Sequence, residues 1–231
     1  MKITLYPNRK GITLIELLVA LVICGLVVAG IYRVFIAQTK AYTIQDQVVE
    51  VQQNVRSTME ILLRDLRMAG YDDDNPNSPI IITNPILHPV AQSSITASYE
   101  KYNTDTAQYE EHEVAYWFDG DTSQLFRQRT VTVNGVADIQ SAENLLENVD
   151  IFNLTYGVDA NEDGAMDDQN VDGVIDENDW VQAAAVGNSR VIAVRMLLTA
   201  RPDQTNTDVQ KMVAPRSLES IVTFRNLFLI R

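Results

Sequence analysis

The stretch Arg9-Lys10-Gly11-Ile12-Thr13-Leu14-Ile15-Glu16-Leu17 decides the fold, because it opens an apolar run that continues to Ile31. The run Ile12–Ile31, interrupted by Thr13 and Glu16, forms about 30 Å of α-helix, which is the thickness of a bilayer core. Positive charge before this run predicts a membrane span with its N-terminus in the cytoplasm and the remaining chain outside. The single cysteine, Cys24, lies inside the span, so neither an intramolecular disulfide nor a cysteine zinc site is expected.

Glu16 is a costly residue inside a membrane-spanning helix, so it indicates a functional role and a positively charged partner. Cleavage after Gly11 would create that partner, because the new α-amino group of Ile12 would lie one helical turn away. Two other processing signals fit less well. A secretory signal would have only a passable cleavage site at residues 27–30, and a lipoprotein signal would need a small residue before Cys24.

The basic leader ending in Gly11, the Glu at the fifth residue after it and the apolar span together resemble the type IV prepilin signature. The resemblance implies that a prepilin peptidase cuts after Gly11 and methylates Ile12, and that Glu16 is needed for methylation and assembly. Arg33 stands where many major pilins carry a Pro that allows the helix to melt. Gly25 and Gly30 could still permit local melting.

The helix is expected to continue beyond the membrane, because residues 37–68 contain neither Gly nor Pro. Apolar side chains recur there at spacings of three and four residues, at Val48, Val51, Val55, Met59, Leu62 and Leu66. Such a stripe is typical of a helix that packs on its own globular domain. The expected organisation is a prepilin leader at 1–11, a transmembrane segment at 12–35, an amphipathic continuation of the helix at 36–68, and a globular β-rich pilin domain at 69–231 with an insertion at 159–179.

Alternating apolar and polar residues in the globular part predict an antiparallel sheet. The expected strands are Ile95–Tyr99, Glu113–Asp119, Gln124–Val133, Val149–Tyr156, Arg190–Ala200 and Glu219–Phe224. Asp119-Gly120 predicts a hairpin, and Ser141–Asn148 is expected to be a short helix or turn. The predicted class is therefore α+β, with a long N-terminal helix packed on an antiparallel sheet, the type IV pilin fold.

Three further segments resemble the PilW family of minor pilins: Arg64-Asp65-Leu66-Arg67-Met68-Ala69-Gly70-Tyr71, Val191-Ile192-Ala193-Val194-Arg195-Met196-Leu197-Leu198 and Thr223-Phe224-Arg225-Asn226-Leu227. This resemblance implies a low-abundance subunit, inserted in the bacterial inner membrane and later part of the pilus, in a complex that initiates assembly and occupies the tip. The implied partners are the prepilin peptidase, other minor pilins, the major pilin, the assembly platform and inner-membrane lipid.

The charge balance, 31 acidic against 18 basic residues, gives a net charge of −13 and argues against binding to nucleic acid. Nine of the acids lie between Asp159 and Asp179, with no Lys or Arg among them. Residues 159–167 and 168–176 each have the pattern D-x-N-x-D-G-x-x-D. The repeat indicates a specific local structure within the globular part.

The second copy fits a calcium loop, which takes oxygen ligands at positions 1, 3, 5, 7, 9 and 12 and needs Gly at position 6. Its ligands would be Asp168, Asn170, Asp172, the carbonyl of Val174, Asp176 and Asp179, with Gly173 at the turn and Ile175 anchored in the core. A weaker site would use Asp159, Asn161, Asp163, the carbonyl of Ala165 and Asp167, and would end on Asn170. Structural calcium is therefore expected, and the alternative is a solvated Asp/Asn/Gly turn.

Catalysis is not expected, because neither His88 nor His112 has a metal-binding or nucleophile motif around it, and both are interpreted as ordinary surface residues. Three functions stay open at this point. The first is a minor pilin of a type IV pilus. The second is a minor pseudopilin of a type II secretion system, and the third is a membrane-anchored surface module that binds its ligand through calcium loops.

Overall fold

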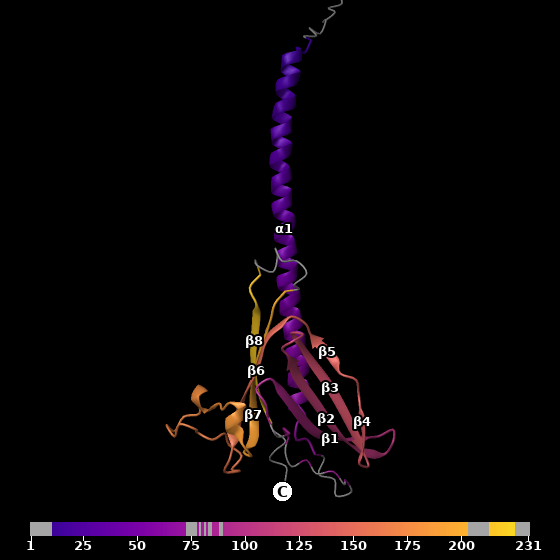
Figure 1. Ribbon diagram of the computed structural model, residues 1–231, viewed down its shortest axis with the longest axis vertical. Helices are drawn as coiled ribbons and strands as arrows, with labels where there is room; N and C mark the ends of the chain where they lie inside the picture. The colour runs from indigo at the N-terminus through magenta and orange to yellow at the C-terminus, as the bar shows by residue number, and fades with distance from the viewer. Residues whose placement is uncertain are drawn as a thin grey trace, which may run out of the picture. The chain divides into compact units, whose positions relative to one another are not determined.

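The computed structural model describes residues 11–72, 78, 80, 82, 85–87, 90–202 and 213–224. Helix α1 (Leu14–Arg67) is followed mainly by strands (Figure 1). The strands are β1 (Ser94–Asn103), β2 (Gln108–Asp119), β3 (Gln124–Val133), β4 (Val136–Ile139), β5 (Glu143–Leu146), β6 (Val149–Asp159), β7 (Arg190–Ala200) and β8 (Arg216–Thr223). A 3-10 turn, η1 (Glu177–Asp179), and the short helix α2 (Ala183–Val186) lie between β6 and β7 in the chain.

The chain divides into two units, Met1–Asp46 and Gln47–Arg231. The described residues of the first unit consist almost entirely of the first part of α1, whose large apolar side chains from Leu14 to Ile36 are exposed. By length and composition, α1 can cross a membrane. The exposure is what a lipid-facing helix requires, because the other described residues of this unit do not cover these side chains.

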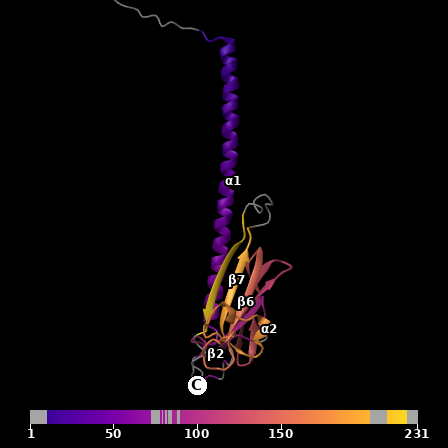
Figure 2. The same ribbon diagram turned by 90° about the vertical axis from the view of Figure 1, so that its left-hand side faces the viewer.

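The second unit contains two antiparallel sheets rather than the single sheet expected from the sequence. The five-stranded sheet, here sheet A, has the order β1-β2-β3-β4, and β5 also pairs with β3. The three-stranded sheet, here sheet B, has the order β6-β7-β8 (Figure 2). The predicted hairpin is confirmed, since Asp119 on β2 pairs with Gln124 on β3. The α+β class with a long N-terminal helix and antiparallel sheets is also confirmed.

The short helix or turn expected at Ser141–Asn148 is wrong, because this segment contains β5. Asn144 pairs with Phe126 of β3, and the side chain of Leu146 is buried. Pairing with β3 and burial of Leu146 outweigh the weak local preference of the segment. Strand β4 was not expected either; it follows a two-residue turn at Asn134-Gly135, where both residues have positive φ.

The predicted apolar stripe of α1 is buried as expected at Val51, Val55, Met59, Leu62 and Leu66, whereas Val48 is only half-buried. These side chains belong to one hydrophobic cluster that also includes residues of both sheets. Each fully buried aliphatic side chain contributes about 1.5–3 kcal/mol relative to exposure. The stripe is thus the shared contact that holds both sheets on the helix.

Asp65 is a buried carboxylate within this otherwise apolar contact. Tyr116 on β2 donates its O–H to Asp65 Oδ2 at 2.6 Å, and Arg127 Nη2 on β3 lies 2.8 Å from the same oxygen. Arg127 Nη1 also lies 3.3 Å from Glu143 on β5. Burial, and the Asp65 carboxylate that accepts the phenol proton, raise the pKa of Tyr116. The network therefore ties α1 to three strands of sheet A.

His112 is buried, so its interpretation as a surface residue is wrong, and His88 lies outside the described residues. The His112 ring stacks on Tyr99 at 5.1 Å, and Arg129 Nη2 lies 2.8 Å from its Nδ1. Because a guanidinium can only donate, Nδ1 must be the acceptor, and Nε2 carries the proton that it donates to Glu110 at 3.0 Å. Burial, with the charge of Arg129, lowers the pKa of His112. The folded state therefore requires a neutral imidazole.

Replacing Tyr116 with Phe removes the hydrogen bond to Asp65 without changing the shape of the ring. We expect the free energy of unfolding to fall by about 1–2 kcal/mol, because the buried carboxylate loses one donor but keeps Arg127. The measurement is urea unfolding of the full chain in detergent, followed by the fluorescence of Trp117 and Trp180. The control Arg56→Ala breaks only the exposed Arg56–Glu60 pair and should cost less than about 0.5 kcal/mol. Equal effects of the two variants would contradict the role assigned to Asp65.

Acidification should destabilise the second unit through His112. Its folded-state pKa lies below the unfolded value of about 6.5, so the unfolded state binds more protons, and stability present above that value is lost as the pH falls. The charged groups around the ring are Glu110, Arg129 and Lys101, and Tyr99 stacks on it. Glu110 has a lowered pKa, mainly because of the hydrogen bond from Asn103. The stability that the ionised Glu110 contributes is therefore lost only at lower pH, below about 4.3.

The variant His112→Gln can accept from Arg129 and donate to Glu110 but cannot titrate. Melting temperatures measured between pH 7 and pH 5 should fall in the wild type and fall less in this variant. The matched control is His88→Gln, which removes the other imidazole of the chain. A pH dependence that follows His88 instead of His112 would overturn this assignment.

Candidate functional site

The acidic tract 159–179 starts at the end of β6, and its sequence repeat is also a structural repeat. The fourth residue of each copy, Glu162 or Val171, has a φ of 59°. The sixth, Gly164 or Gly173, has a φ of 87° or 86°. Left-handed residues at the same two places turn both copies in the same way, and Gly is the residue that adopts this conformation without strain.

The first Asp of each copy binds the turn that follows it. The Asp159 carboxylate accepts hydrogen bonds from the N–H groups of Asp163, at 3.1 Å, and Gly164, at 2.9 Å. The Asp168 carboxylate accepts them from Asp172, at 3.3 Å, and Gly173, at 2.6 Å. Each Asp oxygen thus receives one N–H, and an ionised carboxylate offers about four acceptor positions in total. Acceptor capacity is left over for a further donor or a cation.

The third and fifth residues repeat the same pattern. Asn161 Oδ1 accepts from the N–H of Asp163 at 2.9 Å, and Asn170 Oδ1 accepts from that of Asp172 at 3.1 Å. Asp163 and Asp172 in turn accept from the backbone N–H two residues later, both at 2.8 Å. These side-chain turns order the two loops through local hydrogen bonds.

Asp179 is the twelfth residue of the predicted calcium loop that begins at Asp168. It is fully buried and accepts from the N–H groups of Gln169 and Asp176, both at 2.7 Å. The N–H of Asp176 first, with those of Gln169 and Asn170, lowers the pKa of Asp179 against the effect of burial. The last predicted ligand of the second loop therefore lies beside Gln169, the residue that follows the first ligand, Asp168.

The remaining predicted ligands are not gathered into one shell. Asp176 is turned to the N-terminus of η1, where it accepts from the N–H of Asn178 at 2.7 Å. In the first copy, Asp167 accepts from the N–H of Ala160 at 2.7 Å. Across the described part of the chain, no group of three Asp, Glu, His or Cys side chains lies close enough to hold a metal ion. A cation would have to draw the carboxylates of the second loop inward.

The insertion is anchored on β6 and β7 by Met166 and Trp180, not by Ile175. Ile175 is 52% exposed, so its predicted anchoring in the core is wrong. The equivalent residue of the first copy, Met166, occupies the space over Gly157, where an added Cβ would lie 2.9 Å from Met166 Sδ. Trp180 stacks on the guanidinium of Arg195, 4.7 Å from the ring centroid. Glycine on β6 creates one hollow, and the first copy fills it.

The predicted processing site lies at the start of the described chain. Gly11 precedes α1, and Ile12 is exposed. The N–H and the hydroxyl of Thr13 both donate to Glu16 Oε2 at 2.9 Å. In this form of the chain, Glu16 therefore accepts hydrogen bonds from the N–H and the hydroxyl of Thr13, just before the N-terminus of α1, where a negative charge is favoured.

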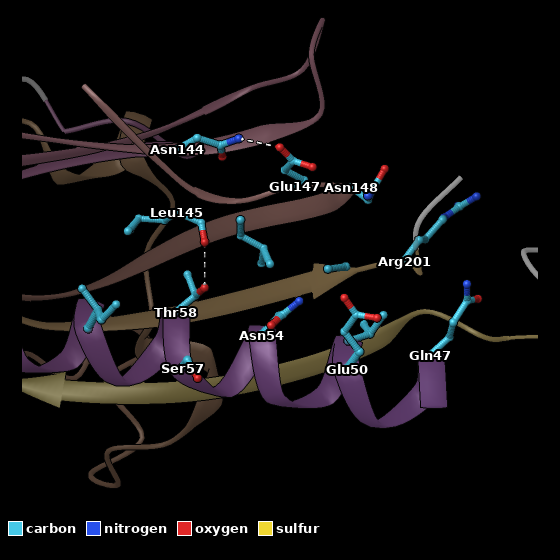
Figure 3. Close-up of a pocket in the computed structure, with 14 residues that line it drawn as sticks. Gln47, Glu50, Asn54, Ser57, Thr58, Asn144, Leu145, Glu147, Asn148 and Arg201 are labelled. Atoms are coloured by element: carbon cyan, nitrogen blue, oxygen red, sulfur yellow. Dashed lines mark hydrogen bonds between the residues drawn. The ribbon is translucent and has the colours of Figure 1, made fainter. Parts of the chain in front are cut away.

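A polar groove of about 400 Å³ lies between α1 and the segment that joins β5 to β6 (Figure 3). Thr58 Oγ1 donates across it to the carbonyl of Leu145 at 3.4 Å. Its other polar side chains include Gln47, Glu50, Asn54, Asn144, Glu147 and Arg201. As far as the structure describes its lining, no His or Cys is present. This groove was not expected from the sequence, because the polar face of the helix indicates only solvation.

Two family models match the chain. The prokaryotic N-terminal methylation motif matches residues 6–32, and the model of the Type IV Pilus-assembly protein W, PilW, matches residues 102–220. The second match covers just over half of the chain and includes most of both sheets. None of the curated proteins matches the chain.

These matches agree with the exposed apolar helix that follows Gly11 and with the resemblance found in the sequence. The methylation motif and this helix anchor the protein in the inner membrane before it enters the pilus. The PilW family consists of structural components of pilus assembly. The chain belongs to the PilW family of type IV pilus-assembly proteins.

Proposed function

We propose that this chain is a minor pilin that the prepilin peptidase cuts after Gly11 and that enters the assembly-initiating or tip complex of a type IV pilus. The observation that carries the proposal is the combination of the methylation motif with Glu16 at the start of an exposed apolar helix. Cleavage would free the α-amino group of Ile12 beside Glu16. The carboxylate would then exchange the neutral donors of Thr13 for a cation, either its own terminus or that of a neighbouring subunit.

The type II secretion pseudopilin is the second candidate, since the same N-terminal helix would serve an export apparatus. The PilW match favours the pilus. The third candidate, a membrane-anchored module that binds a surface ligand through calcium, does not need processing at Gly11. Blocking cleavage at Gly11 would therefore leave the localisation of this module unchanged, unlike that of both pilin-like candidates.

We also propose that the second loop binds structural calcium through Asp168, Asn170, Asp172, the Val174 carbonyl, Asp176 and Asp179. Support comes from the repeated turn, from the acceptor capacity left on Asp168 and from the hydrogen bond that holds Asp179 beside Gln169, the residue after Asp168. Nine carboxylates without a base repel one another, and a divalent cation would reduce that repulsion. The first loop, with Asp159, Asn161, Asp163, the Ala165 carbonyl and Asp167, would bind more weakly because it ends on the amide of Asn170.

Replacing Gly11 with a bulky residue should block cleavage. Mass spectrometry of the N-terminus should find a methylated Ile12 in the wild type and residues 1–11 still attached in Gly11→Val. The control Gly25→Ala adds a Cβ that meets no atom within 4 Å and should be processed normally. Normal localisation and activity of Gly11→Val would favour the calcium-dependent surface module over both pilins.

Deleting the gene separates the pilus from the secretion apparatus. A pilus role predicts loss of piliation and twitching with normal protein secretion, because only the pilus would lose a subunit. The measurement is pilus recovery by shearing, together with an assay of secreted protein in the same strain. Loss of secretion with normal piliation would contradict the first proposal and support the pseudopilin.

Calcium should raise the melting temperature of the full chain in detergent. At a free calcium concentration tenfold above Kd, the gain is about 1.4 kcal/mol, or about 3–6 °C for a domain of this size. Asp172→Asn should lose most of this shift, because it removes a charged ligand but keeps an oxygen that accepts from Val174. The matched control Glu177→Gln removes the same charge at a position that is not a predicted ligand and should keep the shift. Equal shifts in all three proteins would refute the site.

A further inference from the structure

The loop occurs twice in this chain, so a comparison of the two copies shows which residues its fold requires. Both copies have Asp, Asn, Asp and Gly at positions 1, 3, 5 and 6, and these residues make the same hydrogen bonds. They differ at position 2, which is Ala160 or Gln169, and at positions 4, 7 and 8. The last three are Glu162, Ala165 and Met166 in the first copy and Val171, Val174 and Ile175 in the second. Since both copies fold alike, the aliphatic side chains of the second are not needed for its turn.

Packing does not explain these three side chains either. Val171 is 86% exposed, Val174 61% and Ile175 52%, whereas the equivalent Met166 of the first copy is held over Gly157. Val171 also has a φ of 59°, a conformation that is exceptional for a β-branched residue and that Glu adopts in the first copy. Three aliphatic side chains thus project into solvent from a loop whose remaining side chains are mainly acidic.

We propose that Val171, Val174 and Ile175 form a docking knob for a neighbouring pilin subunit, and that they enter an apolar pocket bordered by Lys or Arg. Exposed aliphatic side chains gathered on one loop mark an interaction surface. The loop around the knob, residues 168–179, carries five carboxylates and no basic residue, so a basic border would be complementary to it. The proposal rests on the chain acting as a pilus subunit but does not require calcium.

Two other occupants fit the charges less well. An anionic lipid surface would be repelled, because one bound calcium ion would still leave this loop with a net charge of about −3. In a second copy of the chain, the polar groove beside α1 carries two acidic side chains, Glu50 and Glu147, against one basic side chain, Arg201, so its net charge would oppose an acidic loop. A different subunit with a basic border is therefore the occupant that the charges favour.

Cross-linking in living cells tests which molecule the knob contacts. A photoreactive phenylalanine would replace Val174, and in the control it would replace Ala165, the same position of the first copy. We expect an adduct with another pilin subunit from position 174, at least tenfold more abundant than from position 165, joined at a point with Lys or Arg beside it. An adduct only with lipid, only with a second copy of this chain, or with no pilin at all would overturn the proposal.

Substitution tests whether the contact matters for assembly. The triple variant Val171→Ser, Val174→Ser and Ile175→Ser should reduce the amount of this subunit in sheared pili at least tenfold. The control variant Glu162→Ser with Ala165→Ser changes the first copy and leaves Met166 in place, so it should assemble like the wild type. Recovery of the triple variant at the wild-type level would overturn the docking role.

Melting with and without calcium shows whether either variant has lost its fold, because positions 4 and 8 supply no ligand and position 7 supplies only a carbonyl. Both variants should melt within about 2 °C of the wild type, since the altered side chains are exposed. If the triple variant were destabilised, Val174→Ser alone would be used, with at least a threefold loss from pili expected and no loss overturning the proposal. Failure of the pilus role itself would be seen separately, as absence of the wild-type chain from sheared pili.

Discussion

The contact that the second unit depends on is the buried face of α1 from Val51 to Leu66, with Asp65 as its single buried carboxylate. A buried charge is tolerated only when donors surround it, and here Tyr116 of β2 and Arg127 of β3 supply them. The apolar side chains supply affinity between helix and sheets without fixing their register. The carboxylate restricts that register, because only one alignment brings both donors to the same oxygen.

The second constraint is electrostatic and concerns the acidic insertion. Its carboxylates do not simply point into water, since those of Asp159, Asp168 and Asp179 each accept two backbone N–H groups of their own loops. The backbone dipoles offset part of the repulsion and shape the two turns before any cation is considered. Calcium, as proposed, would act on turns that are already formed, but it would still have to draw the carboxylates of the second loop together.

Some side chains in and next to the acidic insertion anchor it on sheet B, and others are exposed to solvent. Met166 of the first copy packs over Gly157 of β6, and Trp180, directly after the insertion, stacks on Arg195 of β7. The aliphatic side chains of the second copy are exposed. Such a division fits the proposed docking of the second copy on a neighbouring subunit, because this contact would leave the core of the chain unchanged.

The sequence by itself determined the features that depend on local order along the chain. The helix and its buried stripe follow from apolar spacing, the strands β3 and β7 from alternation, and the twin turns from the repeated Asp, Asn and Gly residues. Gly11 and Glu16 can also be identified from the sequence, because the prepilin pattern lies within a few consecutive residues. Cleavage after Gly11 remains a prediction.

Only the tertiary structure decided the features that need two distant segments. β5 is a strand because it pairs with β3. His112 is buried with Arg129 and Tyr99 against its ring, and burial lowers its pKa. Ile175 is exposed, whereas Met166 of the first copy occupies the space over Gly157. Asp65 likewise carries no sequence signal, since a carboxylate in the last turn of a helix is ordinary until Tyr116 and Arg127 reach it. Local spacing fixes which groups can form an element, but burial and charge pairing depend on what another part of the chain brings to them.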